Sequence, residues 1–138
     1  MRPVEHDGDR YLLVKRSGDA SRVRDPATGE EQYLPNEELT PLEAGPLETA
    51  ADAVPEPVRA LVRATRDERG LGLLVTLHAD GPLSVRALLG RYDLCESDAL
   101  GLATEFRAAG LLAETTVAGE RGYELTDEGR RAVERLVS

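Results

Sequence analysis

Few residues of this 138-residue chain could carry covalent or metal chemistry. Cys95 is the single cysteine, and the two histidines, His6 and His78, lie far apart in the sequence. Zinc sites use closely spaced pairs of cysteine or histidine ligands, and the chain has no such pair. Gly70 and Gly72 lack the third glycine that completes a dinucleotide-binding fingerprint. The sequence therefore predicts no enzyme, no catalytic residue, no metal site and no cofactor.

Arginine is the residue type here with the greatest capacity for recognition. The chain has 17 basic residues, and Lys15 is its only lysine. A guanidinium group can pair with two oxygens of a phosphate or with the edge of a guanine. Arg59, Arg63 and Arg66 recur at helical spacing, and we interpret them as a solvent-exposed helix face. We interpret Arg130, Arg131 and Arg135 of the predicted last helix in the same way, and the alternative for both sets is contact with phosphates or a partner. The arginines between the two sets are the candidates for recognition.

The overall charge opposes binding of nucleic acid through charge alone, because 26 acidic side chains give a net charge of −9. An acidic, lysine-poor chain resembles the proteins of salt-loving microbes with molar internal salt, where a Debye length of about 3 Å screens self-repulsion. The alternative is an ordinary acidic protein from a GC-rich genome. No apolar run is long enough to span a membrane. We therefore expect a cytoplasmic protein that does not contact membranes.

Residues 1–45 have the composition of a small antiparallel β-sheet. Short runs of strand-forming residues alternate with glycine-containing turns, and the predicted strands are residues 10–15, 21–25 and 31–34. A sheet this small is marginal alone and needs another element to pack on. An acidic, proline-rich connector follows at residues 46–56, with one short helix near its middle.

Residues 57–138 change to a helical period followed by two strands. Helices are predicted from Pro57, through 71–78, from a Ser84 cap, and from a Ser97 cap to Gly110. Strands at 111–117 and 123–126 follow, and Thr126 caps a final helix. The predicted fold class is therefore α+β: a small N-terminal antiparallel β-sheet followed by this C-terminal domain.

The order of these elements resembles the winged helix-turn-helix of MarR-like and ArsR-like transcription regulators. Residues 106–112, Phe-Arg-Ala-Ala-Gly-Leu-Leu, are typical of a recognition helix that ends at the wing. Residues 122–130, Gly-Tyr-Glu-Leu-Thr-Asp-Glu-Gly-Arg, are typical of the returning wing strand and the closing helix. This resemblance covers residues 69–138. The whole chain also resembles a haloarchaeal family of small proteins of no assigned function that add an N-terminal sheet to such a domain.

The resemblance implies that the helix from Ser97 lies in the major groove of double-stranded DNA. Its outward face combines small and hydroxyl-bearing side chains, with one arginine on one flank and the carboxylates of Asp98 and Glu105 on the other. Further arginines lie on the preceding helix and in the wing. The predicted DNA-binding residues are Arg86, Ser97, Thr104, Arg107 and Arg121.

Two functions stay open. The first is a DNA-binding transcription regulator, which the resemblance implies is a homodimer. The second is a protein-interaction module that packs the small face formed by Gly101, Thr104 and Ala108 against a protein partner. A positive strip along the predicted interface would favour DNA, and a neutral or acidic strip would favour a protein.

We expect the melting temperature to rise between about 0.1 and 2 M KCl, because added salt screens the repulsion among the excess carboxylates. Thermal unfolding followed by circular dichroism measures this. A melting temperature that stays flat or falls over that range would remove the argument for adaptation to salt.

Overall fold

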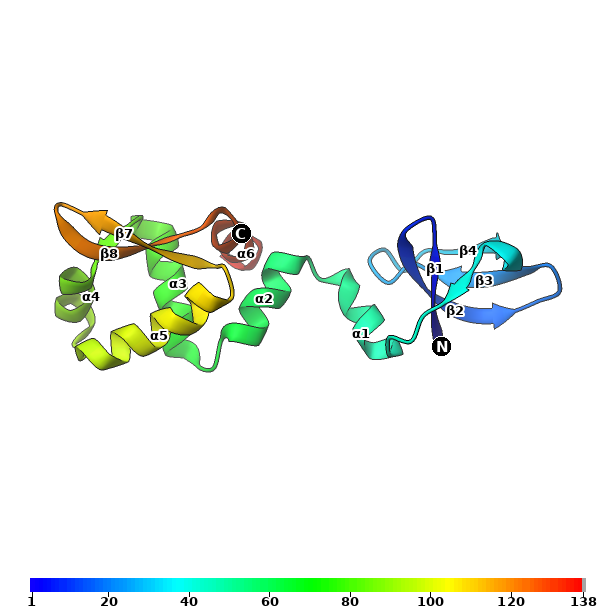
Figure 1. Ribbon diagram of the computed structural model, residues 1–138, viewed down its shortest axis with the longest axis horizontal. Helices are drawn as coiled ribbons and strands as arrows, with labels where there is room; N and C mark the ends of the chain where they lie inside the picture. The colour runs from blue at the N-terminus through cyan, green and yellow to red at the C-terminus, as the bar shows by residue number, and fades with distance from the viewer. Residues whose placement is uncertain (138) are drawn as a thin grey trace. The chain divides into compact units, whose positions relative to one another are not determined.

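The computed structural model describes residues 1–137, and the chain folds as two compact units that divide between Pro55 and Glu56. The first unit is a five-stranded antiparallel sheet in the order β4-β3-β2-β1-β5 (Figure 1). A short 3-10 helix, η1 (Asn36–Glu38), connects β4 to β5 along the chain. The strands are β1 Arg2–His6, β2 Asp9–Arg16, β3 Ala20–Arg24, β4 Glu31–Pro35 and β5 Thr40–Pro41.

The prediction of three strands missed β1 and β5. Asp7 and Gly8 form the two-residue turn between β1 and β2, with φ of 49° and 84°. Positive φ at both central residues is what a tight hairpin turn requires, and Asp-Gly is among its commonest sequences. The signal for β1 was therefore present in the sequence. Strand β5 is only two residues long and pairs with β1, so no local pattern marks it.

The segment after β5 completes the small core of the first unit. Helix α1 (Pro46–Ala50) packs against β1 and β2 and continues into the 3-10 helix η2 (Ala51–Ala53). Thr49 on α1 is fully buried, and its hydroxyl donates to the Gly45 carbonyl at 3.1 Å. The sheet itself buries few apolar residues: Val4, Leu12 and Val23. It therefore needs the helix to complete its core.

The described part of the second unit, residues 56–137, carries five helices and a three-stranded sheet in the order β6-β8-β7. This arrangement confirms the α+β class and the winged helix-turn-helix fold, in which α5 holds the position called the recognition helix and β7–β8 form the wing. The elements are α2 Glu56–Ala64, α3 Glu68–Asp80, β6 Leu83–Ser84, α4 Val85–Tyr92, α5 Glu96–Ala108, β7 Leu112–Val117, β8 Glu120–Leu125 and α6 Asp127–Val137.

Helix α3 runs without a break through Gly70 and Gly72, although glycine weakens a helix. Gly70 is buried against Phe106 of α5, and a Cβ there would lie 3.1 Å from the Phe106 ring. The missing side chain lets α3 and α5 approach closely. The rest of this core is apolar and includes Leu74, Leu88, Leu111, Tyr123 and Val133.

Two of the three predicted helix caps are confirmed. The Ser84 hydroxyl accepts from the Ala87 amide at 3.0 Å, and the Thr126 hydroxyl accepts from the Gly129 amide at 3.0 Å. The prediction for Ser97 is wrong, because α5 begins at Glu96 with Cys95 as its N-cap. No side chain caps α5, so local sequence signals mark its start poorly.

Several apolar residues of α2 and α6 remain exposed to solvent. Val62 is 65% exposed, whereas its neighbour Leu61 is buried. Leu136 and Val137 at the end of α6 are about half exposed. Helices α2 and α6 pack on each other, so these three residues are apolar side chains that the packed pair leaves in solvent.

Gly129 is required by close packing, and we expect Gly129→Ala to destabilise the fold by about 1–3 kcal/mol or more. A Cβ at Gly129 would lie 2.0 Å from the carbonyl oxygen of Leu111, which is backbone and cannot rotate away. Gly90 in α4 is the control, because a Cβ there meets nothing within 4 Å. Gly90→Ala should stabilise by about 0.5–1 kcal/mol. Urea unfolding that gives both variants equal stability would contradict this packing.

Candidate nucleic-acid interface

The exposed side of α5 is a ridge of small, uncharged residues. It comprises Ser97, Gly101, Thr104 and Ala108, and all four are exposed as predicted from the helical period. The Thr104 hydroxyl donates to the Leu100 carbonyl at 2.7 Å, so its oxygen still has lone pairs for an outside donor. The opposite side of the helix holds Ala99, Ala103 and Phe106, which are buried. The recognition helix therefore offers a smooth surface that another molecule can approach closely.

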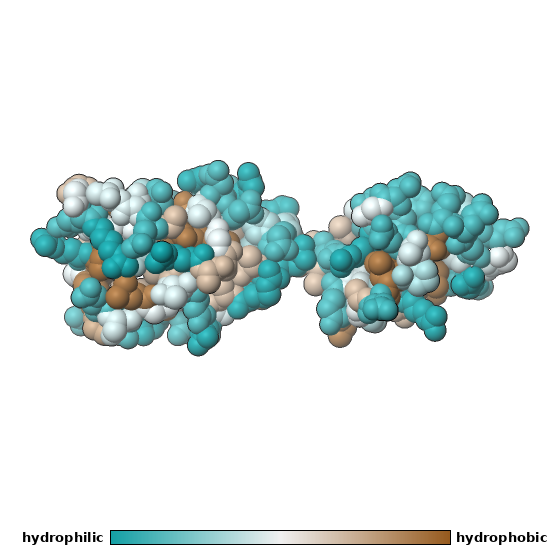
Figure 2. Space-filling view, in the orientation of Figure 1, coloured by the Kyte–Doolittle hydropathy of each residue, from teal (hydrophilic) through white to brown (hydrophobic). Residues whose placement is uncertain are grey.

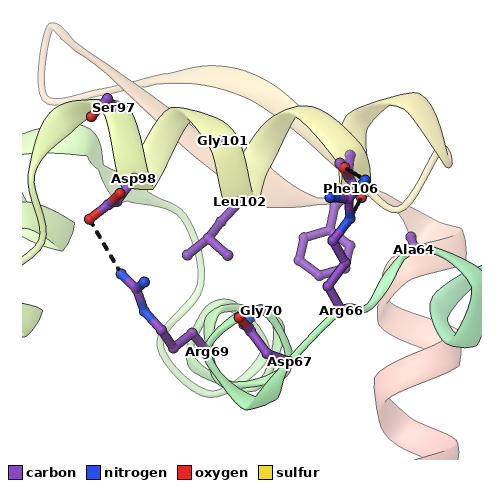
Figure 3. Close-up of a pocket in the computed structure, with 11 residues that line it drawn as sticks. Ala64, Arg66, Asp67, Arg69, Gly70, Ser97, Asp98, Gly101, Leu102 and Phe106 are labelled. Carbon is purple, nitrogen blue, oxygen red and sulfur yellow. Dashed lines mark hydrogen bonds and ion pairs between the residues drawn. The ribbon is translucent and has the colours of Figure 1, made fainter.

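One flank of this ridge carries two carboxylates that are paired with arginines of the preceding segment. The Arg66 Nε donates to Glu105 at 3.0 Å, and an Arg69 guanidinium nitrogen lies 3.7 Å from Asp98. Figure 3 shows Arg69 reaching from α3 to Asp98 on α5. The carboxylates that weaken attraction for DNA are thus partly neutralised.

The sequence interpretation placed Arg66 on the solvent-exposed face of the preceding helix. Its side chain is exposed as predicted, but it does not lie on that helix. Helix α2 ends at Ala64, so the helical spacing from Arg59 and Arg63 does not extend to Arg66. No local signal links Arg66 to Glu105, which lies 39 residues further along the chain.

A hollow of about 340 Å³ lies between this segment and α5. Leu102 and Phe106 point into it from α5, above Gly70 and Asp67 of the α3 region (Figure 3). Four of the charged side chains at its margin form the two ion pairs described above, and Asp67 accepts a hydrogen bond from the Gly70 amide at 3.1 Å. We therefore interpret the hollow as the groove left where α5 packs against α3, and not as a separate binding site.

The other flank of the ridge faces the wing. Glu114 on β7 accepts a hydrogen bond from Arg121 on β8, and the same carboxylate lies 3.3 Å from Arg107 near the end of α5. A hydrogen bond to Glu114 raises the pKa of the Arg121 guanidinium, which is charged in any case. Arg121 also donates to the Tyr123 hydroxyl at 3.4 Å. Three charged groups from three elements thus meet beside the recognition helix.

Arg86 at the start of α4 lies on the same side as the wing. Its side chain is 85% exposed, and one guanidinium nitrogen is 3.3 Å from Glu120 at the start of β8. Arg86, Glu96, Glu120 and Arg121 line one hollow of about 320 Å³ between α4 and the wing. Of the predicted site residues, Ser97 and Thr104 thus lie on the ridge, and the three arginines lie toward the wing.

The surface of the molecule mixes polar and apolar areas. In Figure 2 hydrophilic residues are interspersed with apolar patches on both units. Cys95 is exposed, with its Sγ 3.2 Å from the Ser97 Oγ at the start of α5. Within residues 1–137, no cluster of histidine, cysteine or carboxylate side chains is arranged to hold a metal ion. In the same part of the chain, no helix combines the length and apolarity needed to cross a bilayer.

A search of the curated proteins finds no match. Among solved structures, HlyU from Vibrio vulnificus CMCP6, described as a transcriptional regulator, is 27% identical with a TM-score of 0.50. The similarity covers 65% of this chain and 88% of that protein. HlyU from Vibrio cholerae N16961 is 30% identical with a TM-score of 0.50, covering 58% of this chain and 87% of that one.

Each of these similarities covers about three fifths of the chain. A match to a family model, in contrast, extends over both units. Residues 1–137 match the model described as a family of unknown function (DUF7346), and the chain therefore belongs to that family.

Proposed function

We propose that this protein is a double-stranded DNA-binding regulator of transcription that works in a salt-rich cytoplasm. The observation that carries the proposal is the smooth exposed ridge of α5 with three arginines on its wing side. The similarity to a protein described as a transcriptional regulator supports the same function.

In this proposal α5 enters the major groove, and its small side chains let the helix backbone approach the bases. The hydroxyls of Ser97 and Thr104 can donate to or accept from base edges, and the Ala108 methyl can contact a thymine methyl. Arg86, Arg107 and Arg121 contact phosphates or the edge of a guanine. Phosphate contacts position the helix, and base contacts give sequence preference.

The net charge of −9 is compatible with this function if the protein works at high salt. Non-specific affinity for DNA falls steeply with salt, so a strongly basic surface gains little in molar salt. Shape fit and a few direct contacts then carry the binding. Pairing of the interface arginines with carboxylates fits the same setting.

The alternative proposal is a protein-interaction module, and one observation favours it. Three interface arginines share the two carboxylates Glu114 and Glu120, so most, but not all, of the positive charge on the wing side of the ridge is neutralised. A small neutral ridge suits close packing of another helix. Binding measurements with DNA separate the two functions.

We further propose a homodimer that buries the exposed apolar side chains of the α2–α6 pair: Val62, Leu136 and Val137. We expect sedimentation velocity to give a dimer for the wild type and a larger monomer fraction for Val62→Asp. Because Val62 is 65% exposed in the single chain, the variant should keep the helical circular dichroism spectrum of the wild type, while its melting temperature falls with the loss of the dimer. A wild type that is monomeric at every concentration tested would remove the dimer.

We expect Arg107→Ala and Arg121→Ala to weaken binding to a DNA duplex, whereas Arg63→Ala should not. Loss of a base contact lowers affinity by about 5- to 150-fold. Loss of a phosphate contact instead reduces the slope of the logarithm of affinity against the logarithm of salt concentration by about one. Arg63 is the matched control, because it is 64% exposed and paired with Glu56 on α2. Fluorescence anisotropy with self-promoter and random duplexes, at several KCl concentrations, measures these effects.

If Arg63→Ala is the damaging change, the contact surface lies elsewhere on the domain. If the wild type binds no duplex at any salt concentration, the DNA proposal fails and the protein-interaction module takes its place.

A further inference from the structure

Arg107 and Arg121 reach the same carboxylate from different elements. Arg107 comes from the last turn of α5 and Arg121 from β8, and Glu114 on β7 lies between them. Two guanidinium groups share one carboxylate, so the cluster keeps one positive charge. Arg86 differs, because Glu120 balances it one to one.

A carboxylate and a phosphate present similar oxygen pairs to a guanidinium fork. Glu114 therefore marks a point where this structure already holds an oxyanion between two arginines. The side chains of Arg107, Arg121 and Glu114 are 42%, 51% and 40% exposed, so an anion from solvent can reach them. The cluster lies against the recognition helix, where a DNA backbone would pass in the proposed binding mode.

This inference rests on the proposed function and deepens it. We propose that Arg107 and Arg121 form one phosphate-binding site for the DNA backbone, and that Glu114 occupies this site until a backbone phosphate displaces it.

Displacement of Glu114 is energetically feasible because ion pairs this exposed are weak and are screened by salt. Arg121 keeps a second contact when Glu114 leaves. It donates to the Tyr123 hydroxyl at 3.4 Å, and its guanidinium carbon lies 6.0 Å from the centre of the Tyr123 ring. Tyr123 is only 1% exposed, so it is a rigid support for the arginine. The site can therefore exchange its anion without refolding of the wing.

The test compares Glu114→Gln with Glu128→Gln in the full chain. Both changes remove one negative charge, but Glu128 pairs with Arg131 within α6, away from the ridge. On a random-sequence duplex, Glu114→Gln should bind about twofold to fivefold more tightly than Glu128→Gln, the range that a weak exposed ion pair supports.

A second comparison asks whether the two arginines share one phosphate. The losses of binding free energy in Arg107→Ala and Arg121→Ala should then be non-additive. The double variant should bind DNA only slightly less tightly than the single variant with the lower affinity. Melting temperatures of all the variants check that each is folded.

Two results would overturn the site while leaving DNA binding in place. One is a Glu114→Gln affinity equal to or below that of Glu128→Gln, which would make Glu114 a support for the arginines. The other is full additivity of the two arginine variants. No binding by any variant at any salt concentration would overturn both the site and the proposed function.

Discussion

The close contact between Phe106 and Gly70 sets the orientation of the recognition helix. Phe106 is 2% exposed, and its ring lies where any larger residue at position 70 would need space. Because a helix has a fixed period, burial of this face turns the ridge from Ser97 to Ala108 toward solvent. The same contact brings Asp98 and Glu105 beside Arg69 and Arg66. Both the smooth surface and its paired flanks therefore depend on one piece of core packing.

The wing is held to that core through backbone groups. The Thr126 hydroxyl donates to the Gly110 carbonyl at 2.6 Å, and the Thr126 amide donates to the Leu111 carbonyl at 3.1 Å. Gly129 lets α6 begin directly against Leu111. These contacts connect the end of α5, the wing and the start of α6. Arg107 and Arg121 can meet at Glu114 because the wing has this defined position.

The sequence predicted the elements of the second unit well because their signals are local. Helical period, the Ser84 and Thr126 caps and the glycine-rich wing turn all act within a few residues. The first unit was predicted less completely, since β5 is defined by pairing with β1, although the Asp7–Gly8 turn could have indicated β1. Val62 shows a further limit, because helical spacing does not say how wide a face the neighbouring helices cover.

The candidate site was predictable in part for the same reason. The exposed ridge follows from the period of α5 alone. The pairing of Arg66 with Glu105, and of Arg107 and Arg121 with Glu114, arises only when separate elements pack together. Charge counting therefore overstated the negative field at the ridge and did not reveal that its arginines are already paired.

The most direct test of the account is the mapping of amide chemical shifts as a random-sequence duplex is added to the labelled full chain. The account predicts that the largest changes lie at Ser97, Gly101 and Thr104 on the ridge and at Ala118 and Gly119 in the wing turn. The control region is the first unit, residues 1–55, which should change little. Changes confined to that unit or to α6 would contradict the assignment of α5 and the wing as the DNA-binding surface.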